Sequence, residues 1–314
     1  MRFIYNFFLV LVLVLSACSE DKKTESGSWN LVDSGTTADL GNIQFPDPSI
    51  GYVSGYSSAT GSILLKSTDG GVTWARTAVL PDTFLSSICF LDADTGFYAG
   101  EYGIIMKTTN GGQSWSRKKA GNGDFWDVTF TTYRIGYASG VPDVYKTTDG
   151  GVTWAISLSG ANGVSINFLN DTLGLIGTQN GYSTTVNGGT TWSSHSSPTG
   201  SGFTDVLVID PNMFYAVDHA GHFLKSTNGG VTWTVKDLDP PNALRGLWAI
   251  DAMIIFVVGD GGQIWQSENG GENWARESSG TTELLDDIGF ERKGITGSKG
   301  FIVGFNGTIL TKHF

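Results

Sequence analysis

The sequence STDGGVTW at residues 67–74 occurs in five further close copies along the chain. The copies begin at residues 108, 147, 185, 226 and 267, so their spacing stays near forty residues. Each copy carries an acidic or amide residue at its third position: Asp69, Asn110, Asp149, Asn187, Asn228 and Asn269. A constant spacing of this size is typical of repeat proteins, in which every repeat is one supersecondary unit.

The copies have the chemistry of a closed turn. An Asp or Asn side chain accepts hydrogen bonds from the backbone N–H groups just after it, and two glycines permit positive φ. The hydroxyl of Ser67 can close the loop from the other side, and Trp74 can cover it with an apolar ring. The motif resembles the Asp-box, or BNR, repeat Ser/Thr-x-Asp-x-Gly-x-Thr-Trp. We therefore predict that the six motifs are structural turns joining two strands and not catalytic sites.

Each repeat contains four strand-like segments. In the second repeat they are residues 84–91, 96–100, 103–109 and 114–119, and turns rich in Gly, Asp and Asn separate them. No segment after residue 28 shows helical periodicity with capping residues. This pattern predicts an all-β protein built from propeller blades of four antiparallel strands.

The two ends of the chain set the expected number of blades. After the sixth motif, residues 284–290, 301–304 and 307–312 supply three strands but no fourth. Residues 28–32 match residues 114–118, so Trp29 corresponds to Trp115. This predicts a seven-bladed β-propeller over residues 28–314, in which the N-terminal strand closes the last blade. An open array, or six blades with a capping strand, is the alternative.

Residues 1–17 have the pattern of a signal peptide, with an apolar run over residues 7–15 that is too short to span a bilayer. Residues 15–18, LSAC, resemble a bacterial lipobox and predict a lipid on Cys18. The alternative is an ordinary secretory signal cleaved near Ala17. Ser19 is compatible with transfer to the outer membrane, and the acidic pair after it resembles a surface-export signal of bacterial lipoproteins. We therefore expect a surface-exposed outer-membrane lipoprotein of the bacterial cell envelope, with residues 18–27 as a flexible tether.

The composition excludes several kinds of partner. The formal net charge of the 314 residues is −11, which argues against nucleic acid and against electrostatic attachment to a membrane. The membrane would then be reached through the lipid anchor only. Apart from Cys18 the only cysteine is Cys89, in an apolar strand, so we predict a buried thiol and no internal disulfide. We expect a monomer without a cofactor.

The recurring pattern GYAxG…GxIxKTTDGGxTW, together with the seven predicted blades, is similar to the photosystem II stability/assembly factor family. The resemblance covers residues 28–314. It implies a seven-bladed propeller that binds assembly intermediates and does no chemistry. The chain resembles the relatives in non-photosynthetic bacteria through its lipoprotein signal and its acidity, so we expect a protein or glycan partner.

A carbohydrate-active enzyme is the alternative function, because Asp boxes also occur in sialidases and in xyloglucanase-type glycoside hydrolases. A sialidase needs three arginines on the substrate carboxylate. Three of the six arginines after the signal peptide, Arg76, Arg117 and Arg276, follow motif tryptophans and fall on outer strands, and Arg245 is the one that we expect to face the centre. Xyloglucanase-type enzymes use two facing propellers, whereas this chain has one. A glycoside hydrolase would also need two carboxylates about 5–9.5 Å apart across the channel.

We expect the binding site on the face opposite the motifs. One position per blade, two residues before the first core aliphatic residue, runs around the channel: Gly41, Ser86, Trp126, Val164, Thr204, Arg245 and Asp286. The candidate ligand-binding residues on this face are Trp126, Arg245, Trp248, Asp286, Asp124, Tyr102, His219 and His222.

Aromatic side chains beside carboxylates suit a sugar or a peptide. The alternative is that Trp126 and Trp248 fill the channel and that Arg245 pairs with Asp286. His219 and His222 flank a tight turn without zinc-site spacing, so no metal site is predicted.

Overall fold

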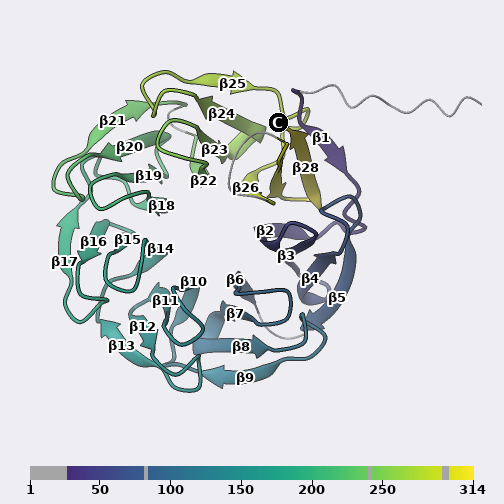
Figure 1. Cartoon of the computed structure of the whole chain (residues 1–314), viewed down its shortest axis with the longest axis horizontal. Coiled ribbons are helices and arrows are strands. Elements are labelled where there is room, and N and C mark those ends of the chain that lie inside the picture. Colours follow the sequence, from purple (N-terminus) through teal and green to yellow (C-terminus); the bar gives the residue numbers. More distant parts are fainter. Residues whose placement is uncertain (1–26, 81–83, 240–241, 292–296) are drawn as a thin grey trace, which may run out of the picture.

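The computed structural model describes residues 27–80, 84–239, 242–291 and 297–314. Within these ranges the chain forms seven four-stranded antiparallel sheets, and Figure 1 shows them arranged as blades around a central axis. The helical segments of the described part are two short 3₁₀ turns, η1 (Glu101–Gly103) and η2 (Asp260–Gly262). The predicted seven-bladed all-β propeller is confirmed.

The blades follow one another along the chain. Blade 1 consists of β2 (Asp39–Asp47), β3 (Ile50–Ser57), β4 (Gly61–Ser67) and β5 (Ala75–Leu80). Blade 2 consists of β6 (Leu85–Phe90), β7 (Gly96–Gly100), β8 (Ile104–Thr108) and β9 (Ser116–Lys119). Blade 3 consists of β10 (Asp124–Phe130), β11 (Gly136–Val141), β12 (Val144–Thr147) and β13 (Ala155–Leu158). Blade 4 consists of β14 (Gly163–Phe168), β15 (Gly174–Thr178), β16 (Gly181–Thr185) and β17 (Ser193–Ser196). Blade 5 consists of β18 (Phe203–Val208), β19 (Phe214–Asp218), β20 (His222–Ser226) and β21 (Thr234–Asp237). Blade 6 consists of β22 (Leu244–Ala249), β23 (Ile255–Gly259), β24 (Gln263–Ser267) and β25 (Ala275–Glu277). Blade 7 consists of β26 (Leu285–Phe290), β27 (Lys299–Gly304), β28 (Thr308–His313) and β1 (Asn30–Val32).

Burial varies with the position of a strand in its blade. All five residues of the second strand β7 are buried, as are those of β15, β19 and β23. The outer strands β9, β17 and β21 are exposed along their whole length. Second strands read as continuous apolar and small residues because neighbouring blades cover both of their faces. The hydrophobic core therefore lies between adjacent blades.

The first and last strands meet in one sheet. β1 pairs with β28 in antiparallel register, Asn30 opposite Thr311 and Val32 opposite Ile309. In Figure 1 the purple β1 accordingly lies beside the yellow β28. The N-terminal strand thus supplies the missing fourth strand, and the alternatives of an open array or six blades are wrong.

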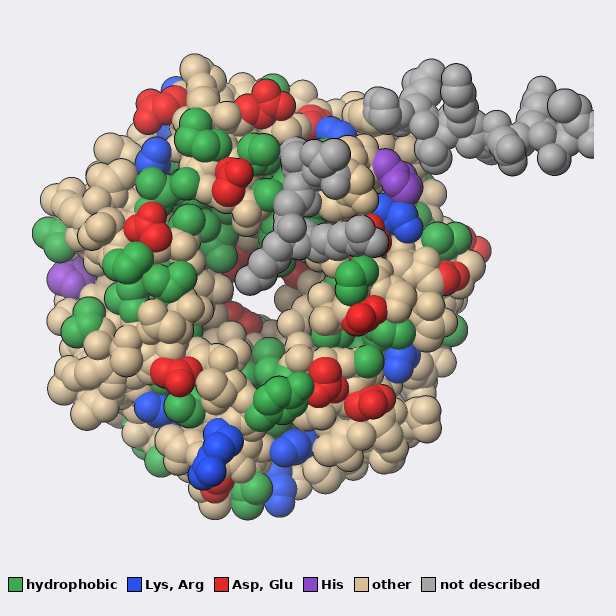
Figure 2. Space-filling view, viewed as in Figure 1, with side chains coloured by type: hydrophobic (Ala, Val, Ile, Leu, Met, Phe, Trp, Pro, Cys, Tyr) green, Lys and Arg blue, Asp and Glu red, His purple; other side chains and the backbone are tan. Residues whose placement is uncertain are grey.

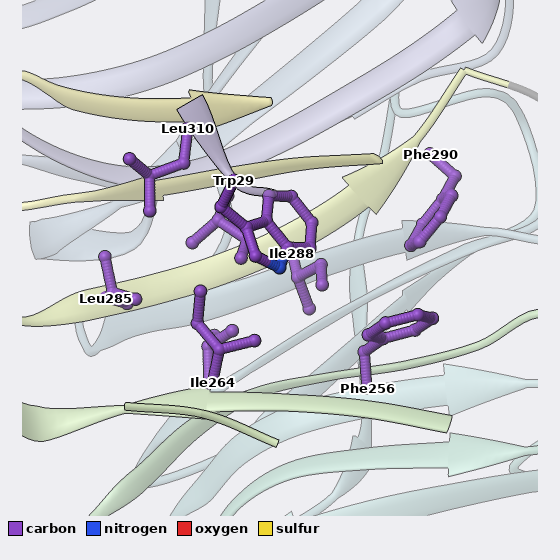
Figure 3. Packing of buried hydrophobic residues seen from close by; sticks show 9 residues of the cluster. Trp29, Phe256, Ile264, Leu285, Ile288, Phe290 and Leu310 are labelled. Carbon is purple, nitrogen blue, oxygen red and sulfur yellow. The ribbon is translucent and has the colours of Figure 1, made fainter. Parts of the chain in front are cut away.

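Trp29 seals the junction between blades 6 and 7. Only 6% of its surface is exposed, and it packs with Ile264 and Phe256 of blade 6 and with Ile288 of blade 7 (Figure 3). Its indole Nε1 donates to Glu277 Oε2 at 2.6 Å. Glu277 is also held by Lys312 Nζ at 2.7 Å. The junction therefore combines apolar packing with a largely enclosed ion pair.

The six motifs form the predicted turns. Asp69 Oδ1 accepts hydrogen bonds from the backbone N–H groups of Val72 and Thr73, at 3.1 and 3.0 Å. Gly70 and Gly71 have φ of 68° and 76°, which only glycine adopts without strain. The Thr73 hydroxyl donates to Asp69 Oδ2 and, with the backbone donors, lowers the pKa of Asp69 to about 2.

The motifs with asparagine keep the same turn, and in three of the four, those of Asn110, Asn187 and Asn228, one hydrogen bond is reversed. Asn110 Oδ1 still accepts from the backbone N–H of Ser114 at 3.0 Å. Its amide nitrogen then donates to the Ser114 hydroxyl at 2.9 Å, where an aspartate would accept. The exchange of Asp for Asn is therefore tolerated because the hydroxyl partner can act as donor or as acceptor.

A lysine before several motifs links neighbouring blades, a role that the sequence did not reveal. Lys107 Nζ donates to the carbonyl of Gly150 at 2.8 Å, and Lys146 Nζ donates to that of Gly188 at 2.6 Å. Lys225 makes the equivalent bond to Gly270. The lysine of one blade thus closes the motif of the next blade.

Cys89 is buried, as predicted, and desolvation raises the pKa of its thiol to about 12. The described helical turns are too short and too polar to cross a membrane. The predicted signal peptide, the lipidated Cys18 and the tether lie outside the described residues, apart from Gly27.

Candidate functional site

The Asp boxes occupy one face of the ring. Each box contacts the turn between the first and second strands of its own blade: Gly70 N donates to Ser49 O, and Gly111 N to Asp94 O. The other face contains the starts of the first strands and the loops between second and third strands. Tyr102 N, in such a loop, donates at 2.9 Å to Asp124 Oδ1 at the start of β10.

A cavity of about 400 Å³ opens on this second face around the axis. Figure 2 shows that the centre of the ring is open and that acidic side chains lie inside it. The first strands of all seven blades line the cavity, and the seven ring positions expected from the sequence all contribute: Gly41, Ser86, Trp126, Val164, Thr204, Arg245 and Asp286.

Three of these seven residues carry an aromatic or a charged side chain: Trp126, Arg245 and Asp286. The hydroxyls of Ser86 and Thr204 are already used, because each donates at 2.6 Å to a carbonyl of the next blade. Trp126 is 41% exposed and lies in blade 3, whereas Arg245 and Asp286 lie in the adjacent blades 6 and 7. Trp126 therefore lies across the axis from the two charged residues, Arg245 and Asp286.

Arg245 does not pair with Asp286, contrary to one of the expected arrangements. Its Nε donates to Asp260 Oδ1 at 3.0 Å. Desolvation raises the pKa of Asp286 to about 6, an effect that the nearby Arg245 charge opposes and the Asp260 charge reinforces. Asp286 accepts no hydrogen bond from any of the described residues that line the cavity.

A second ring of carboxylates, which sequence reasoning missed, lies one residue deeper along the same strands. Asp127 of blade 3 accepts from the Ser87 hydroxyl of blade 2 at 2.8 Å and from Ile166 N of blade 4 at 2.9 Å. Asp205 of blade 5 bridges blades 4 and 6 in the same way.

Asp287 of blade 7 completes this ring by accepting from Asn42 Nδ2 and Ile43 N, both at 2.8 Å. Desolvation raises the pKa of Asp127 and of Asp287, and raises that of Asp205 to about 7. These carboxylates hold the first strands together at the floor of the cavity. The sequence does contain a signal for this second ring: an Asp directly follows the ring position in blades 3, 5 and 7.

A family model described as photosynthesis system II assembly factor YCF48 matches residues 21–201, more than half of the chain. The chain belongs to this family.

A curated relative, the photosystem II assembly lipoprotein Ycf48 of Synechococcus sp. (strain CC9902), is 29% identical over 206 residues. The match spans 60% of this chain and 60% of that relative. Among solved structures, YCF48 bound to a D1 peptide has a TM-score of 0.76 at 21% identity and covers 92% of this chain and 96% of its own.

YCF48 from Cyanidioschyzon merolae has a TM-score of 0.75 at 20% identity and covers 91% of this chain and 99% of its own. The propeller domain of Doa1 has a TM-score of 0.70 at 12% identity and covers 90% and 96%. At these identities the structures show a shared fold.

In this member of the YCF48 family, the structure brings together four of the eight predicted site residues. Trp126, Arg245, Asp286 and His219 line the cavity. Desolvation and the Arg245 charge lower the pKa of His219, which leaves its imidazole neutral at pH 7. Phe84 and Phe305 also line the cavity and were not predicted.

The other four predicted residues lie outside the cavity. Tyr102 and Asp124 lie on the rim of the same face, where they contact each other. His222 lies on the same face, at the start of β20, but outside the cavity: its Nδ1 lies 2.8 Å from Asp218 Oδ2 and its Nε2 lies 3.5 Å from Asp237 of the outer strand.

Trp248 was placed wrongly. It lies three residues beyond Arg245, about 10 Å further along β22, and stacks on Phe290 with ring centroids 6.0 Å apart. The large aromatic side chain therefore packs between blades 6 and 7 and does not fill the channel. In the described ranges, no three Asp, Glu, His or Cys side chains are arranged to hold a metal ion.

Proposed function

We propose that this chain is a non-catalytic propeller that binds a protein partner at the central cavity and is anchored to the bacterial cell envelope through Cys18. The observation that carries this proposal is the cavity on the face opposite the Asp boxes, with Trp126, Arg245 and Asp286 as its large lining side chains. A concave site with aromatic walls and a few convergent polar groups is typical of binding sites.

The geometry of the N-terminal strand supports an anchored, outward-facing site. Asn30 pairs with Thr311 toward the end of β28, on the side of the Asp boxes. The chain reaches the cavity face only at Ser34, whose hydroxyl donates to Gly307 O at 2.6 Å. A lipid tether before residue 28 would therefore attach on the box side. The cavity would then point away from the membrane, which we propose is the outer membrane with the propeller on the cell surface.

The relatives support a protein partner. One is a lipoprotein of photosystem II assembly, and one is a YCF48 that holds a D1 peptide. We carry over the assembly-factor type of function and not photosystem II itself, because the curated match is partial and the structural matches are distant in sequence. The glycoside hydrolase alternative is less favoured, because Asp127, Asp205 and Asp287 are each engaged by two or more hydrogen-bond donors.

Site-specific crosslinking in the native bacterium tests this proposal. A photoreactive benzoylphenylalanine at Tyr102, 63% exposed on the cavity rim, should give a discrete protein adduct. The same group at Val72, 62% exposed on the box face, is the matched control and should not. The adduct should disappear when Trp126, which lines the cavity, is also changed to Ala. Equal adducts from both positions, or an adduct removed by glycosidase and resistant to protease, would contradict a protein partner in the cavity.

A further inference from the structure

We infer that the cavity recognises a positively charged side chain, lysine or arginine, on an extended segment of the partner protein, with Asp286 as the counter-charge and Trp126 as an aromatic wall. This inference rests on the proposed function and adds the chemistry of the ligand to it. The charge balance, the accessibility of one carboxylate and the engagement of the Ser86 and Thr204 hydroxyls support it.

The charges that face the cavity are mostly negative. Its lining includes five carboxyl groups, at Asp39, Asp127, Asp205, Asp286 and Asp287. Burial raises the pKa of Asp127, Asp205 and Asp287, which reduces the negative charge that these three carry, whereas Asp286, with a pKa of about 6, is mostly ionised at pH 7. The cations on the same wall are already balanced or neutral, since Arg245 is paired with Asp260 and the pKa of His219 is lowered. A cation entering the cavity is therefore attracted, whereas a carboxylate or phosphate is repelled.

Asp286 is the carboxylate that a ligand can reach. The deeper ring carboxylates are engaged by neighbouring blades, whereas Asp286 accepts no hydrogen bond from the described residues around it. The adjacent ring position is Gly41, and a Cβ atom there would lie 3.3 Å from Asp286 Oδ2. Glycine at position 41 thus leaves open a side of the carboxylate that any larger residue would cover.

The opposite wall suits the same ligand. Trp126 lies three blades away from Asp286 in a ring of seven, so the two side chains face each other across the axis. A tryptophan face is the best aromatic partner for an ammonium or guanidinium group. Tyr56, Phe84 and Phe305 supply apolar surface nearby for the aliphatic stem of the side chain.

The neutral polar groups of the cavity do not favour a sugar. The hydroxyls of Ser86 and Thr204 each donate to a backbone carbonyl of the next blade at 2.6 Å. Few neutral donors are thus left for the many hydroxyls of a glycan, whereas a cation needs only a carboxylate and a π face. A cavity of about 400 Å³ is large enough for one long side chain and its backbone.

Selection of displayed heptapeptides on the full-length chain in detergent tests this inference. Peptides enriched on the unchanged protein should carry Lys or Arg at one fixed position. Replacing that residue by norleucine should weaken binding about tenfold, and Asp286→Asn should weaken binding of the cationic peptide by a similar factor. The two losses should not add, because the norleucine peptide has no charge for Asp286 to contact.

Two further variants separate this effect from misfolding. Gly41→Val should block the carboxylate and weaken the cationic peptide without removing any charge, whereas Asp69→Asn on the box face should leave affinity unchanged. Melting temperatures of all variants are measured alongside. Enrichment without a Lys or Arg consensus, or equal affinity of the cationic peptide for the unchanged protein and Asp286→Asn, would overturn the inference.

Binding of N-acetyl-lysine amide as tight as that of the whole peptide would also overturn it, in favour of a small free cation. If any of these results overturned the inference, the crosslink from position 102 to a protein would still form. If the proposed function itself were wrong, that crosslink would be absent as well.

Discussion

Replacing Trp29 by alanine should open the junction at which the N-terminal strand closes the ring. The side chain is 6% exposed and packs in a cluster that spans blades 6 and 7. Its indole N–H donates to Glu277 at 2.6 Å, and Glu277 also binds Lys312. The substitution therefore removes apolar burial, one hydrogen bond to a charged group and part of the enclosure of an ion pair.

A second variant separates the loss of unfolding free energy into a part from apolar burial and a part from the hydrogen bond. Truncation of a buried tryptophan to alanine costs about 3–5 kcal/mol of unfolding free energy. Trp29→Phe retains most of the apolar burial and loses the hydrogen bond to Glu277, which is worth about 1.5–3 kcal/mol at most. Because Lys312 still holds the carboxylate, we expect a loss near the lower end for Trp29→Phe.

Urea denaturation followed by far-ultraviolet circular dichroism measures both variants. Leu31→Ala, two residues after Trp29 in β1 and 73% exposed, is the control and should change stability by less than about 0.5 kcal/mol. If Trp29→Ala and Leu31→Ala shifted the unfolding midpoint equally, with unchanged slopes, the N-terminal strand would not be needed to close blade 7.

Four other predictions concern the anchor, the boxes and the cavity. Cys18→Ala should release the protein from membranes in fractionation, and retention with fatty-acid labelling would contradict the lipid anchor. Asp69→Ala should lower the unfolding free energy by about 1–2 kcal/mol, as the loss of capping hydrogen bonds does. Asp69→Asn should lower it by less than about 0.5 kcal/mol, because four native boxes carry Asn. Equal losses for the two variants in thermal denaturation would refute this role of the box hydrogen bonds. Trp126→Ala should weaken binding of the selected cationic peptide with little change in melting temperature, and the reverse outcome would place the site elsewhere. The pKa of Asp286 is raised to about 6, so its protonation favours the folded state; this contribution is present below about pH 4 and is lost as pH rises through 6. Asp286→Asn should therefore remove part of the fall in stability over that window, and an identical slope would refute the assignment.

The fold could be predicted because its main signals are local or strictly periodic. The hydrogen bonds within an Asp box connect residues at most four positions apart, such as Asp69 and Thr73. The spacing of the boxes then repeats one blade, and the match between residues 28–32 and 114–118 revealed the closing strand. The residues that line the channel could also be predicted from the repeat, because equivalent residues of equivalent strands meet at one axis.

The pairing inside the cavity depended on contacts between blades that the repeat pattern does not specify. Arg245 lies near both Asp260 and Asp286, and the folded backbone brings its Nε to 3.0 Å from Asp260. Trp248 shares a strand with Arg245, yet its distance along that strand places it against Phe290 of the next blade. The carboxylates of Asp127, Asp205 and Asp287 bridge residues about forty or more positions apart.

The chain alone thus specifies seven blades, their closure and which residue of each first strand faces the axis, because these follow from periodicity and from turns of a few residues. Some of those residues form hydrogen bonds to neighbouring blades, and others stay open to a ligand. Hydrogen-bond distances of about 3 Å between strands that are remote in sequence decide which. Ser86 and Asp286 occupy equivalent positions. Only the folded ring shows that the Ser86 hydroxyl is bonded to Phe125 while the Asp286 carboxylate faces the cavity.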